Sequence, residues 1–497
     1  MGATGDLLLG IDLGTSSTKT VIMNREGKVL ASSAQEYGID HPHPGYAEQD
    51  PEAWVQAAYR TIQTALSKGS IHARQVVGIG ISGQMHGTVC VDASGMHIRP
   101  AIIWADQRSG TQVTKVYEQL GKERLGEWTA NPLATGFMLA TWLWLVENEP
   151  ATLGQTRWLC LPKDYLRYRL TGRTGTEPSD ASSTLLFDTL HRAWSVELMD
   201  ALGLDPSLLP EIYESAKVAG GLSREAASQC GLLPGTPVVY GGSDQALQAL
   251  GHGIVRTGLV SCTIGSGGVL LAPVENPVYD PHLRMHLFCH ALPDLWHLEA
   301  AILSAGLSLK WLRDSIFPHE SYGSLADAAA QAPPGAEGLS FLPHLAGERT
   351  PYMDPDARAA FTGLTLRHGR QHLARAVKEG VVMALKQGLV LMQEMGVPID
   401  RIVASGGGTR HPLWLQLMAD IFNQPVYLTT AQEAAAMGAA ILAGAGTGVY
   451  SSARQASLEI GRTAEHVIHP ISQNSRYYEK SYQVFCRLYP ALNSLQG

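Results

Sequence analysis

The sequence is poor in charged residues. They make up only 16% of the 497 residues, whereas 45% are hydrophobic. This balance excludes a disordered chain, because disorder requires much charge and little hydrophobicity. A hydrophobic chain of this length exceeds what one core usually supports, so two or more compact domains are expected.

Long apolar runs are also missing. The run at residues 7–11 ends at Asp12 and is too short for a signal peptide. The stretch from Phe137 to Val146 is shorter than the roughly 18 residues that a membrane-spanning helix needs. We therefore expect a cytoplasmic protein without a membrane segment.

The sequence contains neither closely paired cysteines nor a run of basic residues. Its cysteines lie far apart and predict reduced thiols rather than a zinc site. They are Cys90, Cys160, Cys230, Cys262, Cys289 and Cys486. The net charge of −8 argues against a nucleic-acid partner. An acidic protein can still bind phosphate where backbone amides, helix N-termini or a metal ion supply a positive field.

The first half begins with a predicted hairpin. Residues 7–11 form an apolar strand, residues 12–17 a polar turn and residues 20–23 a second strand. A third strand is predicted at 29–32. Helix-like and strand-like segments then alternate, which favours an α/β layer with a mainly parallel sheet. These segments lie at 51–65, 76–81, 158–161 and 163–170.

The second half repeats this plan. A predicted strand at 237–240 ends in Gly241-Gly242-Ser243-Asp244 and leads into a helix, and another hairpin with a glycine-rich tip follows at 259–272. Further strands and helices are expected at 401–405, from 412 onward, at 426–428 and at 433–443. The repetition predicts two similar α/β domains, residues 1–250 and 251–497.

The two hairpin tips are candidates for binding phosphate. A glycine permits the tight turn, and hydroxyl groups add donors to the backbone amides. One such turn alone is as a rule purely structural, but two in equivalent places can hold a polyphosphate from opposite sides. The candidate residues are Gly14, Thr15, Ser16, Ser17 and Lys19 at the first tip, and Gly265, Ser266 and Gly267 at the second.

Two aspartates lie at strand ends near these turns. Asp12 would repel phosphate unless Mg²⁺ or its water shell lay between them, so it is a candidate metal-associated residue. A side chain that merely stabilises its own turn is the alternative. Asp244 follows two glycines at the position where α/β sheets bind ligands, and it can accept a proton from a substrate hydroxyl. Its alternative role is a helix N-cap.

Three further segments are candidates for binding the substrates. Gly406-Gly407-Gly408 leaves room for a nucleotide against the backbone, or is a tight strand–helix turn. Gly83-Gln84-Met85-His86-Gly87 offers amide and imidazole groups to sugar hydroxyls, although a lone histidine is more often an ordinary hydrogen-bonded residue. Trp104, Asp106 and Arg108 can wall a sugar pocket or form a structural salt bridge.

In their order along nearly the whole chain, these motifs resemble those of the FGGY carbohydrate kinases. The motifs are Asp12-Leu13-Gly14-Thr15-Ser16, Trp104-Ala105-Asp106-Gln107-Arg108, Gly241-Gly242-Ser243-Asp244, Gly347-Glu348-Arg349-Thr350-Pro351 and Gly406-Gly407-Gly408. Within that family, three segments look most like bacterial xylulokinases. They are Gly83-Gln84-Met85-His86-Gly87, Leu161-Pro162-Lys163-Asp164-Tyr165 and Phe288-Cys289-His290-Ala291-Leu292-Pro293.

The resemblance implies a fold of the actin and sugar-kinase (ribonuclease H-like) type, with two α/β domains around a deep cleft. Sugar would bind mainly to the first domain and ATP to the second. Asp244 matches the family's catalytic base, Asp12 its magnesium-associated aspartate, and Met85 and His86 its sugar contacts. The turn at Gly265 to Gly267 matches a phosphate-binding turn, and Gly407 and Gly408 match a nucleotide-binding turn.

Three positions depart from the family pattern. Ser266-Gly267 stands where Thr-Ser is usual, so the phosphate turn keeps one hydroxyl and loses another. Gln245 replaces the asparagine that contacts sugar in xylulokinases, and Thr141 replaces a usual lysine.

The expected activity is phosphorylation of a small ketose, D-xylulose at O5, by ATP with Mg²⁺. A kinase for ribulose or gluconate is the nearer alternative, and a non-catalytic actin-like nucleotide switch is the more distant one. Sugar and ATP are the expected partners, and the sequence leaves a homodimer open.

Overall fold

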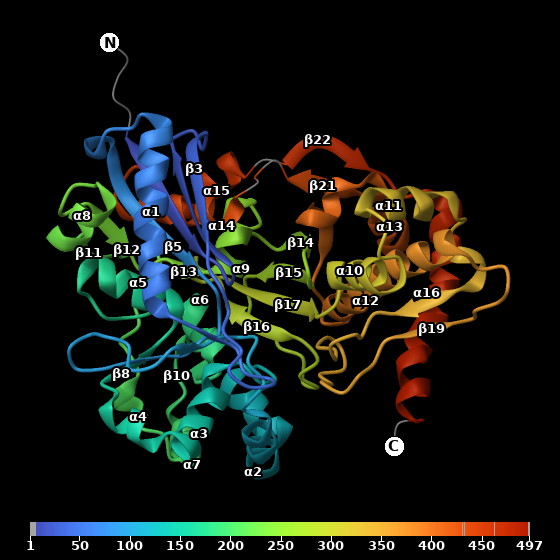
Figure 1. Cartoon of the computed structure of the whole chain (residues 1–497), viewed down its shortest axis with the longest axis horizontal. Helices are drawn as coiled ribbons and strands as arrows, with labels where there is room; N and C mark the ends of the chain where they lie inside the picture. Colours follow the sequence, from blue (N-terminus) through green and yellow to red (C-terminus); the bar gives the residue numbers. More distant parts are fainter. Residues whose placement is uncertain (1–5, 430, 432, 462, 496–497) are drawn as a thin grey trace.

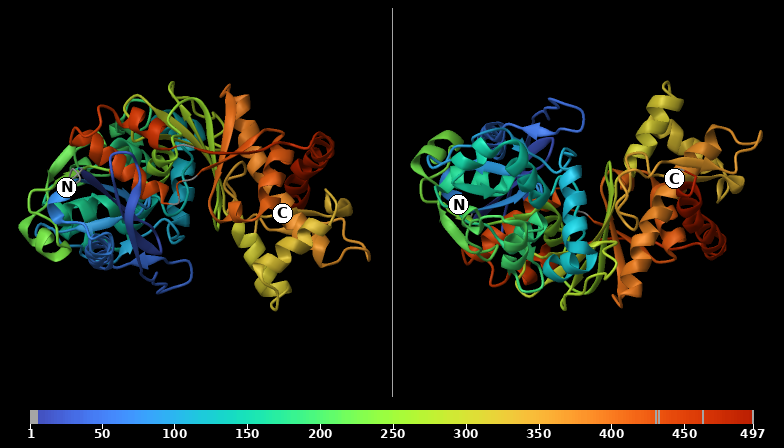
Figure 2. Two further views of the ribbon diagram at one scale, coloured as in Figure 1. Left: turned by 90° about the horizontal axis from the view of Figure 1, so that it is seen from above. Right: turned by 90° about the horizontal axis from the view of Figure 1, so that it is seen from below.

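The chain forms two lobes that lie side by side, each built on one large sheet (Figures 1 and 2). The structure is a computed structural model, and it describes residues 6–429, 431, 433–461 and 463–495. The first sheet has the strand order β11-β12-β5-β1-β2-β3, and the second has the order β16-β17-β15-β14-β20-β21-β22.

The strands of the first sheet are β1 (Leu7–Leu13), β2 (Ser17–Met23), β3 (Val29–Glu36), β5 (Val76–Gly83), β11 (Val218–Gly221), β12 (Pro237–Val239) and β13 (Gly242–Ser243), which also pairs with β5. Those of the second sheet are β14 (Gly258–Ile264), β15 (Gly268–Val274), β16 (His286–Cys289), β17 (Trp296–Ile302), β20 (Ile399–Ser405), β21 (Val426–Thr429) and β22 (Thr463–Ile468).

The two sheets share one pairing plan. In the first, β1, β2 and β3 are successively antiparallel, β1, β5 and β12 are parallel, and β11 closes the edge antiparallel. In the second, β14, β15 and β17 repeat the antiparallel part, β14, β20 and β21 the parallel part, and β22 the closing strand. This repetition confirms the prediction of two similar α/β domains.

The prediction of a mainly parallel sheet is wrong, because each sheet is mixed. Short turns join β1 to β2 and β14 to β15, and a turn of a few residues can join only antiparallel neighbours. The helical connections account for the parallel pairs alone. The predicted strand at 158–161 forms as β8 (Trp158–Cys160), but it pairs with β6 (Val89–Val91) outside the large sheet.

Helices cover both faces of the first sheet. Side chains alternate along a strand, and Leu7 and Leu9 accordingly pack toward α1 (Pro51–Gly69) while Leu8 packs toward α14 (Ala434–Gly446). Gly10 leaves room for the α14 backbone, because a Cβ there would lie 1.8 Å from the carbonyl oxygen of Ala436. Figure 1 shows this late helix among the early strands of the first lobe.

The return of α14 bears on the domain division. The proposed division at residue 250 separates the two sheets, but α14 and α15 (Ala453–Ile460) come from the second half of the chain and pack with the first lobe. The chain therefore crosses between the lobes more than once. The exact division stays a prediction.

The remaining helices connect the strands or cover the second sheet. In the first lobe they are α2 (Gly110–Thr129), α3 (Met138–Asn148), α4 (Pro150–Gln155), α5 (Pro162–Thr171), α6 (Pro178–Ala181), α7 (Val196–Leu202), α8 (Arg224–Cys230) and α9 (Asp244–Gly251). In the second they are α10 (Gly306–Trp311), α11 (Tyr322–Gln331), α12 (Arg370–Glu394), α13 (Pro412–Phe422) and α16 (Ser472–Asn493). Short strands pair as β4 (Glu48–Gln49) with β7 (Ala101–Ile102), β9 (Phe187–Asp188) with β10 (Ala193–Trp194), and β18 (Ser340–Leu342) with β19 (Ala360–Thr362).

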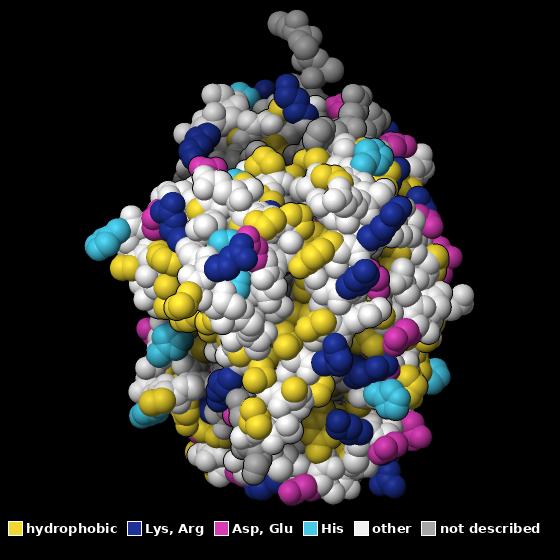
Figure 3. Space-filling view, turned by 90° about the vertical axis from the view of Figure 1, so that its right-hand side faces the viewer, with side chains coloured by type: hydrophobic (Ala, Val, Ile, Leu, Met, Phe, Trp, Pro, Cys, Tyr) yellow, Lys and Arg dark blue, Asp and Glu magenta, His cyan; other side chains and the backbone are white. Residues whose placement is uncertain are grey.

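The surface of the second lobe mixes residue types. On the face shown in Figure 3, lysine and arginine side chains lie scattered among acidic, uncharged and hydrophobic ones. Within the described ranges, no helix combines the length and the apolar character needed to cross a membrane.

Candidate active site

The two candidate aspartates lie at one edge of the first sheet. Asp12 on β1 is paired in register with Ser82 on β5, and Ser82 is paired with Gly242 on β13. The Ser82 hydroxyl donates a hydrogen bond of 3.0 Å to Oδ1 of Asp12. Because parallel strands end at the same edge, Asp12 and Asp244 lie close enough for the charge of Asp12 to raise the pKa of Asp244.

Asp244 is the first residue of α9, and Ser243 occupies the N-cap position. The alternative of Asp244 as an N-cap is therefore not what the structure shows. Its Oδ1 is enclosed and has no hydrogen-bond partner in the part of the chain that the structure describes. The pKa of Asp244 is raised to about 8, mainly by burial and further by the charges of Asp12 and Glu299, against the opposing effect of hydrogen bonds from Gln245. A carboxylate with this pKa can act as a base near neutral pH.

A glycine turn delivers Asp244 to this position. Gly241 has a φ of 85°, and a Cβ there would lie 2.0 Å from the carbonyl oxygen of Ile81. Only glycine satisfies both the positive φ and this close approach. The turn is thus fixed by backbone contact with β5.

A buried ionic cluster contacts the turn that precedes Asp244. Lys163 is completely buried, and its Nζ lies within 4.0 Å of three buried carboxylates, those of Asp164 (2.7 Å), Asp180 (3.5 Å) and Glu177 (3.7 Å). Burial alone would lower the pKa of Lys163, but these carboxylates outweigh it and raise the pKa. Ser179 bonds to Glu177 and accepts the backbone N–H of Ser243 at 3.0 Å, which ties the cluster to the start of α9.

Asp12 has a positively charged neighbour, Lys19, across the hairpin. Burial raises the pKa of Asp12, and the Ser82 hydroxyl and Lys19 oppose the rise. Lys19 Nζ lies 2.9 Å from the Glu433 carboxylate, so this predicted phosphate ligand already has an acidic partner.

The first hairpin tip is held by hydrogen bonds. The Gly14 N–H donates to the Ser17 carbonyl at 3.0 Å, and the Tyr37 hydroxyl donates to the Gly14 carbonyl at 2.5 Å. Trp104 Nε1 donates to the Thr15 hydroxyl at 2.8 Å. Trp104 therefore contacts a candidate phosphate-binding residue and does not only line the predicted sugar pocket. Ser16 is exposed at the tip.

His86 is held as a neutral imidazole by a backbone carbonyl. Its Nδ1 lies 2.8 Å from the Ser183 carbonyl oxygen, so Nδ1 carries the proton and Nε2 is an acceptor. Burial, together with the charge of Arg349, lowers the pKa of His86 to about 3. Its ring lies 4.1 Å from Phe137 and 6.0 Å from Phe288, measured between ring centres. Met85 beside it is buried.

Sequence reasoning missed two charged residues of this site. Glu299 lies on β17 of the second sheet, and burial raises its pKa to about 7 while its Oε2 has no hydrogen-bond partner among the described residues. Arg349 lies 5.6 Å from the centre of the Phe137 ring, and its charge contributes to the lowered pKa of His86. In the sequence, Arg349 stood out only as part of the family motif at residues 347–351. A carboxylate within the apolar strand at 296–302 was the signal for Glu299.

Two predicted sugar contacts are buried in other interactions. Asp106 is 1% exposed and accepts hydrogen bonds from Arg108 and from the Ala47 backbone, which is the structural salt bridge considered as its alternative role. Gln84 is also buried, and its amide donates to Gln49 at 2.9 Å. Neither side chain is brought to an open surface by this structure.

The second hairpin tip and the glycine-rich turn meet in one pocket of about 480 Å³. Gly265 and Ser266 form one side, and Gly407 and Gly408 follow β20 on the other. The Gly265 carbonyl accepts the Gly306 N–H at 2.9 Å, which fixes the tip against the start of α10. Two segments about 140 residues apart thus form one site with room for a nucleotide.

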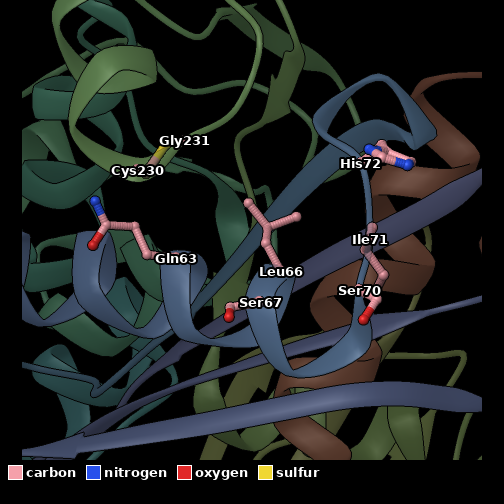
Figure 4. Close-up of a pocket in the computed structure, with 8 residues that line it drawn as sticks. All are labelled: Gln63, Leu66, Ser67, Ser70, Ile71, His72, Cys230 and Gly231. Atoms are coloured by element: carbon pink, nitrogen blue, oxygen red, sulfur yellow. The ribbon is translucent and has the colours of Figure 1, made fainter.

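Another pocket, of about 510 Å³, lies between the end of α1 and α8 (Figure 4). None of the site residues lines it. Its lining is formed by Gln63, Leu66, Ser67, Ser70, Ile71, His72, Cys230 and Gly231.

The departures from the family pattern have different structural settings. Ser266 lines the nucleotide-sized pocket, and Gln245 is adjacent to the Asp244 carboxylate. Thr141 is buried in α3, and nothing in the structure explains its difference from the family.

Comparison with known proteins identifies the family. Residues 7–251 match the N-terminal domain, and residues 260–447 the C-terminal domain, of the FGGY family of carbohydrate kinases. The chain therefore belongs to this family and is an ATP-dependent sugar kinase. It is 36% identical to a xylulose kinase of Bacillus subtilis over 97% of this chain and 96% of that one.

Two further relatives show the range of similarity. A xylulose kinase structure from Rhodospirillum rubrum superposes with a TM-score of 0.90 and 30% identity, over 98% of this chain and 99% of that one. A gluconokinase of Bacillus subtilis is 31% identical, over 97% of this chain and 95% of that one.

Proposed function

We propose that the protein transfers the γ-phosphoryl group of ATP to O5 of D-xylulose in the cytoplasm, with Asp244 as general base. The observation that carries this proposal is the enclosed, unpartnered Oδ1 of Asp244, which lies near Asp12 of the first sheet and Glu299 of the second. Asp244 accepts the hydroxyl proton while that oxygen attacks phosphorus and ADP leaves. No covalent intermediate with the protein is required.

The residues around Asp12 fit a magnesium ion held mainly by phosphate and water. No group of three or more histidine, cysteine or acidic side chains in the described residues could hold a metal by itself. Asp12 is a half-buried carboxylate close to that of Asp244, and a cation would offset their repulsion. Bound Mg²⁺ would supply charge neutralisation at the transferred phosphoryl group.

The sugar would lie against Met85 and His86. His86 Nε2 can accept one hydroxyl hydrogen, while Arg349 and Glu299 offer a donor and an acceptor to others. A small open-chain ketose matches a site with few polar groups. The relatives with similar full-length sequences include xylulose kinases, which supports this choice of sugar.

Gluconate is the second candidate substrate. Arg349 could pair with its carboxylate, and one relative is a gluconokinase. The acidic neighbours Glu299, Asp12 and Asp244 argue against an anionic sugar, because like charges repel in a buried site.

A substrate panel tests the proposal. ADP release with Mg-ATP should be measured with D-xylulose, D-ribulose, L-ribulose, L-xylulose, glycerol and gluconate. D-xylulose should give the highest kcat/KM. If another member exceeds it by more than about tenfold, or roughly 1.4 kcal/mol, the sugar assignment is wrong. Absence of sugar-dependent ADP release would instead favour a nucleotide switch.

A further inference from the structure

One buried lysine lacks a counterion. Lys378 on α12 is 0% exposed, and its Nζ lies 4.3 Å from the centre of the Trp414 ring. Among the described residues, no carboxylate lies within 4.0 Å of this amine. Lys163 is equally buried but has three carboxylate neighbours. Burial of an ammonium group without such partners is unfavourable, so the charged form of Lys378 is destabilised in this setting.

Lys378 lines the same pocket as the phosphate turn and the glycine-rich turn. The position of Lys378 along α12 shows near which end of the pocket it lies. Leu385, seven residues later on the same helical face, lies against Gly268 directly after the phosphate turn. Seven residues span about 10 Å of helix. Lys378 therefore lies toward the end of the pocket away from the phosphoryl group that is transferred.

The charged groups around this end of the pocket have partners elsewhere or are exposed. Glu379 on the same helix pairs with Arg375 at 2.7 Å. On the neighbouring elements, Asp314 pairs with Lys310 at 2.6 Å, and Asp327 lies 3.6 Å from His411. The remaining cation is Arg410, which is exposed. None of these acidic groups is left to neutralise Lys378.

Burial lowers the pKa of Lys378 from 10.5 to about 7. Near pH 8 the amine is therefore mainly neutral while the pocket is empty. The folded state opposes its protonation, so the stability cost is complete below about pH 7 and disappears above pH 10.5. A polyphosphate in the pocket would reverse this preference, because its negative charge favours the ammonium form.

We propose that Lys378 is a nucleotide-binding residue that gains its proton from solvent when the nucleotide binds. The ammonium group then donates a charge-assisted hydrogen bond to the nucleotide. This inference rests on the proposed kinase function. Because Lys378 lies away from the transferred phosphoryl group, it affects nucleotide affinity rather than the rate of transfer.

Calorimetric titration with Mg-ADP at pH 8, in two buffers of different ionisation enthalpy, measures the protons taken up. Wild type should take up about one proton more per nucleotide than Lys378→Met, because a pKa near 7 rises well above 8 on binding. The pKa of Asp244 is also near 8, so Asp244 can contribute to the proton uptake of both proteins. The difference in proton uptake between wild type and Lys378→Met is therefore the quantity that tests the inference. Lys310→Met is the matched control, because Lys310 lines the same pocket but is exposed and paired. It should keep the wild-type proton uptake.

Kinetics give a second measure. Lys378→Met should raise the KM for ATP roughly tenfold and leave kcat within about twofold. Unchanged proton uptake together with an unchanged KM would show that Lys378 only packs on Trp414, and would overturn the inference. If wild type binds no Mg-ADP, the proposed function fails instead.

A folding control separates these outcomes from damage to the protein. Lys378→Met removes a buried charge, so it should unfold at a temperature no lower than that of wild type at pH 7, with a smaller difference at pH 10. If this variant does not fold, Lys378→Gln provides the same two measurements.

Discussion

The two hairpins place different chemistry on the same backbone plan. Two residues before the tip glycine, the first hairpin has Asp12 and the second has Thr263. Each bonds to a serine on the neighbouring parallel strand, Asp12 to Ser82 at 3.0 Å and Thr263 to Ser405 at 2.7 Å. The duplicated frame thus carries a carboxylate in one half and a neutral hydroxyl in the other.

The comparison extends to the turns that follow these serines. After Ser82 come Gly83 to Gly87, which include His86, and after Ser405 comes the glycine-rich turn at 406–408. The turn in the first half therefore carries the side chains proposed to contact the sugar, whereas the turn in the second half has glycines at the nucleotide-sized pocket. A repeated fold supplies two sites, and local side chains decide what each site binds.

The largest expected effect concerns Asp244 at the start of α9. Asp244→Asn should lower kcat roughly 10²- to 10⁴-fold, because an amide cannot accept the hydroxyl proton. Sugar binding, followed by intrinsic fluorescence or calorimetry, should remain. The folded state disfavours the charged carboxylate above its ordinary pKa of 3.8, so the variant should unfold no earlier than wild type at pH 8. Near-normal turnover would contradict the role of Asp244.

The second effect is pH dependence. Asp244 must be deprotonated to act as a base, and its pKa is about 8. The kcat/KM of wild type should therefore fall about tenfold for each pH unit below 8. The charge of Asp12 contributes to the raised pKa, so Asp12→Thr should move the midpoint to lower pH. A flat profile between pH 6 and 8 would show that another step controls the rate.

The third prediction concerns a variant in which the first hairpin is made to resemble the second. Asp12→Thr introduces a hydroxyl that can bond to Ser82, as Thr263 bonds to Ser405 in the second hairpin, but removes the carboxylate beside the proposed metal. The Mg²⁺ concentration required for half-maximal rate should rise roughly 10- to 100-fold. Sugar binding without nucleotide should change little, which serves as the internal control. An unaltered magnesium requirement would remove Asp12 from the metal site.

The smallest effect separates the two turns. His86→Ala removes an acceptor for a sugar hydroxyl and should weaken sugar binding by about 1–3 kcal/mol. The KM for ATP should stay near its wild-type value, because the nucleotide-sized pocket contains no part of the Gly83 to Gly87 segment. Equal losses for sugar and nucleotide would indicate a general disturbance of the fold.

Local sequence patterns determined much of this protein. The apolar runs at 7–11 and 259–264 predicted strands β1 and β14, and the glycines between strands predicted both hairpin tips. Asp244 was selected because it follows Gly241 and Gly242 at a strand end. These features depend on neighbours in the chain, since alternation, turns and helix starts are local properties.

Only the tertiary structure decided which polar groups are buried and near one another. It buried Asp106 in a salt bridge and gave the N-cap position to Ser243, whereas Glu299 came from the other sheet toward Asp244. It also left Lys378 without a counterion beside Trp414. A pKa depends on desolvation and on charges that are distant in the sequence, so these properties appear only when the chain is folded.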